Sequence, residues 1–176
     1  MEDIEKAHNE VERKFLMTGY LNELDFNKII VGIYKQFYTS ISPEVRFRKD
    51  SQTFGVRENS PVWKTSYLQE IKSNGDLSRR EIPIEISSEQ YEEVLKIVNK
   101  IPIEKKYNIY EIGYRNFAVC YVDNEWYYGE IEFDTEEEAN AWVIPEALKP
   151  YIIEEVTYDP NYKMKNYWKR TRLDKE

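Results

Sequence analysis

The chain has 176 residues, 33 of them acidic and 25 basic, so its formal net charge is -8 and its length suits a single domain over residues 1–176. The acidic balance argues against binding of a nucleic-acid polymer, which depends mainly on Lys and Arg neutralising phosphates. The lack of an apolar run of about 18–20 residues argues against a membrane span, and an acidic start argues against a secretory signal. We therefore expect a cytoplasmic protein. With one cysteine and one histidine it can form neither an internal disulfide nor a Cys/His zinc site, so any metal would bind carboxylates.

Alternation of apolar and polar residues with a period of two predicts strands along most of the chain. In chain order they cover residues 8–17, 30–39, 44–49, 53–57, 62–72, 77–86, 105–112, 116–122 and 126–133. Helices are predicted over 87–99, where Ser88 can act as N-cap, over 135–143, and in a shorter piece within 160–170. Many strands and few helices indicate a mostly β (α+β) fold with an antiparallel sheet or a closed barrel.

The charged residues of several strands gather on one face. These faces consist of Glu10, Glu12 and Lys14 in the first strand, Arg46 and Arg48 in the third, and Glu130 and Glu132 in the last. Exposure to solvent is the ordinary explanation of any one such face. If the faces instead meet across the lumen of a barrel, they line a cavity with charges of both signs. Such a cavity suits a polyanion that is bound together with a divalent metal ion.

Phosphoryl transfer is a reaction that such a cavity supports. It requires cations at the nonbridging phosphate oxygens and carboxylates for Mg²⁺ or Mn²⁺. The four glutamates would offer the oxygen ligands that these hard cations prefer. Arg46, Arg48 and Lys72 would hold phosphate oxygens, and an arginine can bind two oxygens at once.

Several segments resemble, in order, those of a known family. The stretch from Glu10 to Lys14 (EVERK) resembles the Glu-x-Glu-x-Lys signature that opens the CYTH superfamily, also called the triphosphate tunnel metalloenzymes. The later matches are QFY at 36–38, EVRFR at 44–48, IKSNGDLSRRE at 71–81, IEK at 103–105, GEIEF at 129–133 and EVTYDPNYK at 155–163. Matched blocks in one order are far more specific than any single motif.

The resemblance implies an eight-stranded antiparallel β-barrel tunnel with a few flanking helices. It implies that triphosphate is held by Lys14, Arg46, Arg48, Lys72, Arg79, Lys105 and Lys163, and that Mg²⁺ or Mn²⁺ is held by Glu10, Glu12, Glu130, Glu132 and Glu81. In similar hydrolases the signature lysine pairs with a tyrosine, here Lys14 with Tyr38, to orient the attacking water. The expected function is a metal-dependent triphosphatase whose substrate is inorganic triphosphate or a small organic triphosphate, such as thiamine triphosphate or a nucleoside triphosphate.

Three positions depart from the family pattern. Pro83 stands where a second glutamate is usual, Tyr107 where an arginine is common, and Cys120 where an aspartate is expected. A hairpin over residues 50–63 also resembles an insertion. These departures leave two alternatives open, a class IV-type adenylate cyclase that makes cyclic AMP from ATP and a catalytically weak module that binds a triphosphate or a nucleotide. The formation of a homodimer is likewise left open.

Overall fold

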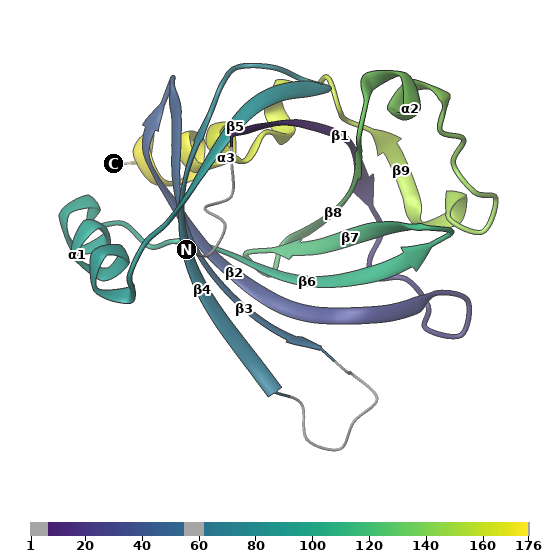
Figure 1. Ribbon diagram of the computed structural model, residues 1–176, viewed down its shortest axis with the longest axis horizontal. Coiled ribbons are helices and arrows are strands. Elements are labelled where there is room, and N and C mark those ends of the chain that lie inside the picture. Colours follow the sequence, from purple (N-terminus) through teal and green to yellow (C-terminus); the bar gives the residue numbers. More distant parts are fainter. Residues whose placement is uncertain (1–6, 55–61, 176) are drawn as a thin grey trace.

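The computed structural model describes residues 7–54 and 62–175, and eight of its strands close into an antiparallel barrel (Figure 1). The barrel closes because β1 (His8–Met17) pairs with β8 (Trp126–Phe133) along one edge and with β5 (Ser78–Glu85) along the other. Between β5 and β8 the strands follow in the order β4 (Val62–Lys72), β3 (Glu44–Phe54), β2 (Asn27–Ile41), β6 (Ile103–Ile112) and β7 (Arg115–Val122). The predicted mostly β barrel is confirmed.

Two differences from the predicted strands concern pairing. Residues 53 and 54 of the predicted strand 53–57 belong to β3, which continues without a break and pairs with β4 as far as Phe54 opposite Val62. Of the predicted hairpin over 50–63, residues 50–54 and 62–63 therefore extend the β3–β4 pair, and residues 55–61 lie outside the described parts. A ninth strand, β9 (Ile152–Glu155), pairs with the second half of β1 and was not predicted. Its four residues are too few to show an alternation.

Helices lie outside the ring of strands. α1 (Ser88–Val98) begins after Ser87, whose hydroxyl accepts a hydrogen bond from the backbone N–H of Gln90 while the Gln90 side chain accepts from the Ser87 N–H. The prediction of Ser88 as N-cap was wrong by one residue, because Ser87 is the last residue with extended backbone. The others are α2 (Glu136–Ala141), η1 (Lys149–Tyr151), η2 (Pro160–Tyr162), α3 (Met164–Trp168) and the π-helical turn η3 (Lys169–Leu173). None of the described helices is long and apolar enough to cross a membrane.

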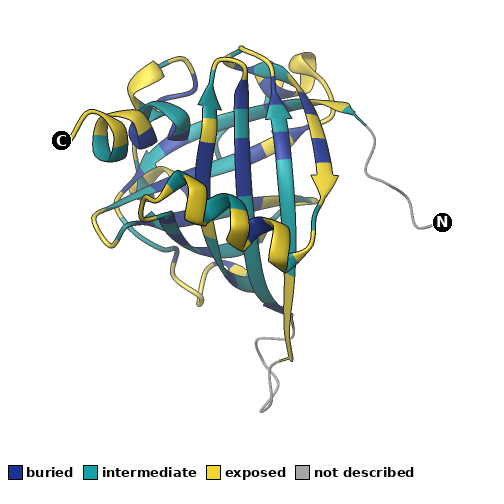
Figure 2. Cartoon of the chain, turned by 90° about the vertical axis from the view of Figure 1, so that its left-hand side faces the viewer, coloured by how far each residue is buried: buried dark blue, intermediate teal, exposed yellow. Residues whose placement is uncertain are grey.

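Much of the apolar core lies between the outer face of the barrel and the elements that cover it. α1 lies across the outer face of the strands (Figure 2). Phe37 of β2 and Phe47 of β3 stack with ring centres 5.3 Å apart, and Tyr91 of α1 packs on Phe37. On another part of the wall, Phe15 contacts Phe117 and Trp142. Because successive side chains of a strand point to opposite faces, burying these residues outside the wall turns their polar neighbours into the lumen.

Candidate functional site

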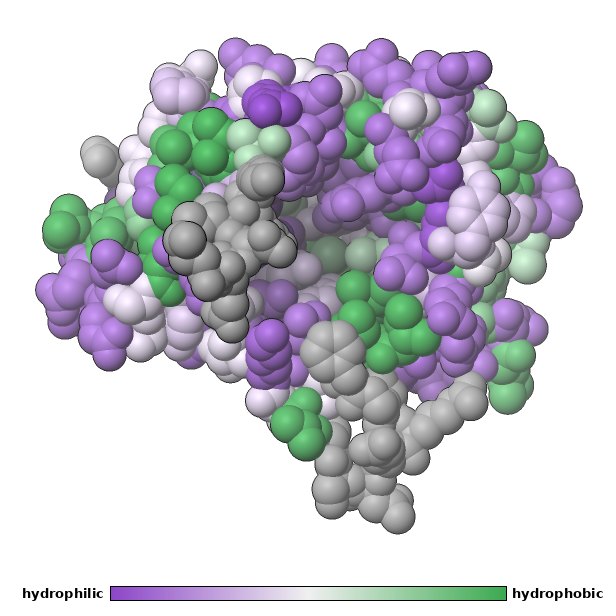
Figure 3. Space-filling view, in the orientation of Figure 1, coloured by the Kyte–Doolittle hydropathy of each residue, from purple (hydrophilic) through white to green (hydrophobic). Residues whose placement is uncertain are grey.

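The inner faces of the strands line one cavity of about 1090 Å³. Figure 3 looks into this hollow, which is rimmed largely by hydrophilic residues. All of the site residues predicted from the sequence lie on its lining: Glu10, Glu12, Lys14, Tyr38, Arg46, Arg48, Lys72, Arg79, Glu81, Lys105, Glu130, Glu132 and Lys163. The charged faces of the strands thus meet across the lumen. The roles of these residues remain predictions.

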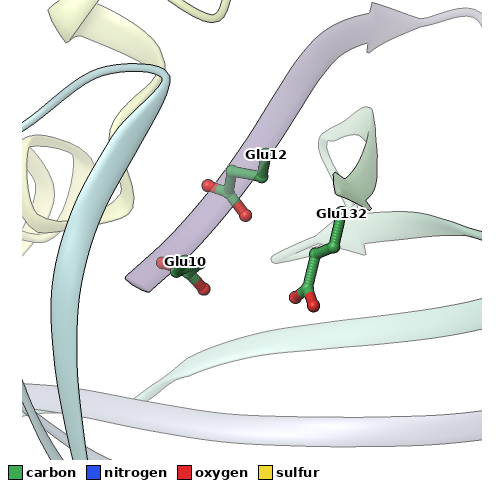
Figure 4. Close-up of side chains that lie close together, drawn as sticks. All are labelled: Glu10, Glu12 and Glu132. Carbon is green, nitrogen blue, oxygen red and sulfur yellow. The ribbon is translucent and has the colours of Figure 1, made fainter. Parts of the chain in front are cut away.

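Three of the predicted metal ligands form a compact cluster (Figure 4). Glu10 and Glu12 come from β1 and Glu132 from β8, and one carboxylate oxygen of each lies within 4.8 Å of the others. Burial, followed by the charges of Glu130 and Glu10, raises the pKa of Glu12 to about 8. Burial and the same two charges also raise the pKa of Glu132. The crowding of oxygen ligands and negative charge fits a hard divalent cation such as Mg²⁺ or Mn²⁺.

The other two predicted metal ligands lie against lysines. The Glu130 carboxylate is 3.9 Å from Lys14 Nζ; although burial raises its pKa, the charges of Lys14 and Lys105 prevail and hold it at about 2. The Glu81 carboxylate is 3.2 Å from Lys72 Nζ, and burial raises the pKa of Glu81 to about 7 despite that lysine. The structure therefore brings Glu10, Glu12 and Glu132 together and leaves Glu130 and Glu81 beside the cluster.

Two predicted phosphate ligands are joined to this cluster through Glu10. Lys72 Nζ lies 3.0 Å from both carboxylate oxygens of Glu10, and Arg79 Nε donates to one of them at 2.9 Å. These cations outweigh the effect of burial and hold the pKa of Glu10 well below its usual range. Arg79 also donates to the buried Glu44 at 3.0 Å through Nη1. One guanidinium thus links the acidic cluster to the start of β3.

A second buried network joins the two arginines of β3 to Glu70 of β4. Arg46 Nε donates to Glu70 at 2.7 Å, and Arg48 Nη2 lies 3.3 Å from the other oxygen of the same carboxylate. Glu70 stands directly opposite Pro83 in the β4–β5 pairing, and both line the cavity. Glu70 of β4 therefore places a carboxylic acid directly beside Pro83, which stands where the family pattern has a second glutamate.

Sequence reasoning missed Glu44 and Glu70. Each stands two residues before a predicted phosphate ligand on the same strand, Glu44 before Arg46 and Glu70 before Lys72. The alternation of a strand places such neighbours on one face. That spacing was the signal that could have found them.

The predicted pair of Lys14 and Tyr38 lines one cavity, but each side chain has other neighbours. Lys14 Nζ lies 4.4 Å from the centre of the Tyr128 ring and donates to the Tyr162 carbonyl at 3.3 Å. The Tyr38 hydroxyl accepts from the Gln36 side chain at 3.0 Å. Burial raises the pKa of Tyr38 far above its ordinary value, so this phenol stays protonated. Among the described residues, the tyrosine ring in contact with the Lys14 ammonium is therefore Tyr128 and not the predicted Tyr38.

Lys163, the last of the predicted phosphate ligands, is held at the turn between β4 and β5. Its ammonium donates to the Gly75 carbonyl at 2.7 Å and pairs with the Asp76 carboxylate. This contact ties the segment before α3 to the rim of the cavity.

The two remaining departures also occupy inward-facing strand positions. The Tyr107 hydroxyl donates to Asp50 at 2.7 Å and to Gln52 at 3.2 Å, while its ring stacks on Tyr34 with centres 4.2 Å apart. Cys120 is 1% exposed, and burial raises the pKa of its thiol to about 11. A protonated, enclosed thiol fits the interpretation of Cys120 as a small packing residue rather than a nucleophile.

Comparison with known proteins points to the same architecture. No family model and no curated protein matches the chain. Two solved structures of the protein NE1496, one described as a hypothetical protein and the other as an inorganic triphosphatase, superpose with a TM-score of 0.56 at 24% identity. The match covers 90% of this chain and 96% or 93% of the other. The PH1819 protein from Pyrococcus horikoshii OT3 gives a TM-score of 0.49 at 18% identity, over 80% of this chain and 85% of that one.

The closed ring of eight antiparallel strands surrounds a lumen lined by charged side chains. The chain shares this barrel fold with NE1496.

Proposed function

We propose that this protein is a metal-dependent triphosphatase that hydrolyses inorganic triphosphate or a small organic triphosphate inside the tunnel. The observation that carries the proposal is the cavity itself, in which arginines and lysines from several strands share one lining with a cluster of three carboxylates. This combination meets the two needs of phosphoryl transfer, neutralisation of the phosphate oxygens and binding of a divalent metal ion. The likeness to the inorganic triphosphatase NE1496 supports the same reaction class.

The cations would bind and orient the phosphate chain. Arg46 and Arg48 lie next to each other on the inner face of β3, and Lys72 lines the cavity from the adjoining strand β4, where it stands opposite Glu44. Their contacts with Glu70 and Glu10 keep the side chains extended into the lumen. Preorganised charges of this kind stabilise the equatorial oxygens of the transferred phosphoryl group without rearranging during the reaction.

Glu10, Glu12 and Glu132 would hold Mg²⁺ or Mn²⁺. When bound there, the metal ion would supply additional positive charge at the phosphate oxygens and help to orient them. Glu12 must lose its proton to act as a ligand, since its pKa is raised to about 8. Metal binding and proton release are therefore coupled at this residue.

Lys14 would orient the attacking water. Its ammonium lies 4.4 Å from the centre of the Tyr128 ring and 3.9 Å from the ionised Glu130, and its strand also carries Glu10 and Glu12 of the acidic cluster. Tyr38, whose hydroxyl stays protonated, would act as a hydrogen-bond donor to substrate or water rather than as a base.

The test is release of phosphate from inorganic triphosphate, ATP or thiamine triphosphate, measured with Mg²⁺, with Mn²⁺ and with a chelator. We expect release that requires metal and is lost in Glu12→Gln. Glu136→Gln, an exposed residue in the first turn of α2, is the matched control and should leave the rate unchanged.

Two other results would redirect the assignment. Cyclic AMP among the products from ATP would indicate a nucleotidyl cyclase. Binding of triphosphate without phosphate release, detected as a rise in Tm, would indicate a binding module.

A further inference from the structure

The cations of the tunnel fall into two groups according to their partners. Arg46, Lys72 and Arg79 each have a carboxylate oxygen within 3.0 Å. Lys14 has its nearest carboxylate at 3.9 Å, and Lys105, within the described parts of the chain, has none at ion-pair distance. Arg48 belongs between the groups, because its Nη2 lies 3.3 Å from Glu70 while its buried Nε has no hydrogen-bond partner among the described residues.

Tyrosine side chains lie next to Lys14, Lys105 and Arg48. Lys14 Nζ is 4.4 Å from the centre of the Tyr128 ring, whereas Lys105 meets Tyr128 at its hydroxyl, to which it donates at 2.8 Å. Lys105 Nζ is 5.0 Å and Arg48 Cζ 4.4 Å from the centre of the Tyr34 ring. The order along the wall is Lys14, Tyr128, Lys105, Tyr34, Arg48. We call these five residues the cation–tyrosine row.

Neighbouring side chains enclose the two tyrosine rings of this row. Tyr128 has no exposed surface. Tyr34 stacks on Tyr107, whose hydroxyl is bound to Asp50 and Gln52. The Tyr107 ring in turn lies directly over Gly32, where an added Cβ would come within 2.2 Å of it. The stack on Tyr107 therefore leaves the Tyr34 ring little room to turn.

We propose that Tyr34 and Tyr128 are positioning residues of the phosphate site, which hold Lys14, Lys105 and Arg48 side by side for the substrate. This inference rests on the proposed function and deepens it. A ring face attracts a cation through its quadrupole, and the Tyr128 hydroxyl accepts a hydrogen bond from Lys105. Neither group carries a charge, so both can hold neighbouring cations without neutralising them. A carboxylate in the same place would have to be displaced by an incoming phosphate. The row thus leaves the charges of Lys14 and Lys105 less compensated than those of Arg46, Lys72 and Arg79, while Arg48 shares its charge with Glu70.

The test is binding of inorganic triphosphate, without metal and at constant pH, by titration calorimetry. Tyr34→Leu removes the ring between Lys105 and Arg48 and should weaken binding by about tenfold. Tyr34→Phe keeps the ring and should restore the wild-type Kd to within about twofold, since cation–π attraction does not need the hydroxyl. Mn²⁺ binding to the protein alone should be the same in all three proteins, because the acidic cluster does not contact Tyr34.

A matched control separates positioning from a general loss of stability. Tyr91→Leu removes a buried ring on the outer face of the barrel, so it should lower Tm without changing the Kd for triphosphate. Equal binding by wild type and Tyr34→Leu would overturn the positioning role and leave the proposed function intact. A failure of Tyr34→Phe to restore binding would also overturn it. Absence of triphosphate binding by the wild type would overturn the proposed function and this inference together.

Discussion

The carboxylate of Glu70 accepts a hydrogen bond from Arg46 Nε at 2.7 Å, and both side chains are buried in the tunnel wall. The charges of Arg46 and Arg48 outweigh the effect of burial and hold the pKa of Glu70 well below its usual range. A residue that no motif indicated therefore fixes the direction of two predicted phosphate ligands. It also competes with the substrate for them.

Glu70→Gln should destabilise the protein and make its thermal stability more dependent on bound triphosphate. Removing one member of a buried ion pair costs about 3–5 kcal/mol, because the arginines keep their charges without a counter-charge. Bound triphosphate would restore negative charge beside them. We expect the Tm of Glu70→Gln to lie below that of the wild type and to rise more than the wild-type Tm on addition of inorganic triphosphate.

Glu92→Gln on the exposed face of α1 is the control and should change the free energy of unfolding by no more than about 0.5 kcal/mol. An equal rise in Tm with triphosphate for wild type and Glu70→Gln would show that Arg46 and Arg48 do not meet the ligand.

Lys105 should give triphosphate binding a dependence on pH. Burial lowers the pKa of this ammonium to about 8, so its charge is lost as the pH rises through that value. The affinity of the wild type for triphosphate should therefore fall between pH 7 and pH 9.5 relative to that of Lys105→Arg, whose guanidinium stays charged. Calorimetry on both proteins measures this, since ionisation of the ligand is common to both and cancels in the ratio. Parallel pH profiles would contradict a role for the charge of Lys105.

The same burial means that Lys105 should lower the free energy of unfolding. Its pKa of about 8 lies below the value of about 10.4 for an unfolded lysine, so the unfolded chain binds more protons between these pH values. The free energy of unfolding therefore rises with pH between about pH 8 and pH 10.4, and the destabilisation by Lys105 is complete below about pH 8. Lys105→Met should raise Tm at pH 7, with a smaller gain at pH 10, and should weaken triphosphate binding. Lys106→Met, on the outer face, should show no such pH-dependent gain, and a lower Tm for Lys105→Met at pH 7 would refute the argument.

Metal binding should release a proton from Glu12. The pKa of about 8 means that this carboxyl is largely protonated at pH 7, and a divalent cation at the cluster displaces that proton. The affinity for Mn²⁺ should rise with pH up to about 8, by at most about tenfold per pH unit for one proton. Calorimetry in buffers of different ionisation enthalpy counts the protons. Glu12→Gln should bind Mn²⁺ more weakly and release none, whereas an unchanged proton count in this variant would assign the release to another group.

The close approach of Gly32 and Tyr107 should be visible in a double-mutant cycle. A Cβ at Gly32 would come 2.2–2.5 Å from the Tyr107 ring, so Gly32→Ala must displace the ring or bend β2. We expect a loss of about 1–3 kcal/mol in the free energy of unfolding, measured with urea. In a Tyr107→Leu background the same change should cost clearly less, because the smaller side chain leaves room. Additive losses would mean that the ring is not what excludes a side chain at residue 32.

The sequence by itself determined much of the barrel and of its lining. Period-two alternation located most of the strands, and the shared faces of Glu10 with Glu12 and of Arg46 with Arg48 predicted which side chains line a lumen. The physical reason is local, since a strand sends alternate residues to opposite faces whatever its partners are. The order of the motifs then predicted an eight-stranded tunnel. It did not indicate β9 or the continuation of β3 to Phe54, because both depend on pairing with distant strands.

Only the tertiary structure decided which charges meet. Alternation puts Glu10, Glu130 and Glu132 on inner faces, but the stagger of the closed barrel brings Glu10 to Glu132 and Lys72, and Glu130 to Lys14. The register of β3 with β4 set Glu70 opposite Arg46, and the order of the strands around the barrel placed tyrosines between Lys14, Lys105 and Arg48. These contacts join residues far apart in the chain, and their energies depend on burial as much as on charge. Strand alternation fixes the face on which a residue lies, whereas the closed barrel fixes its neighbours across the lumen.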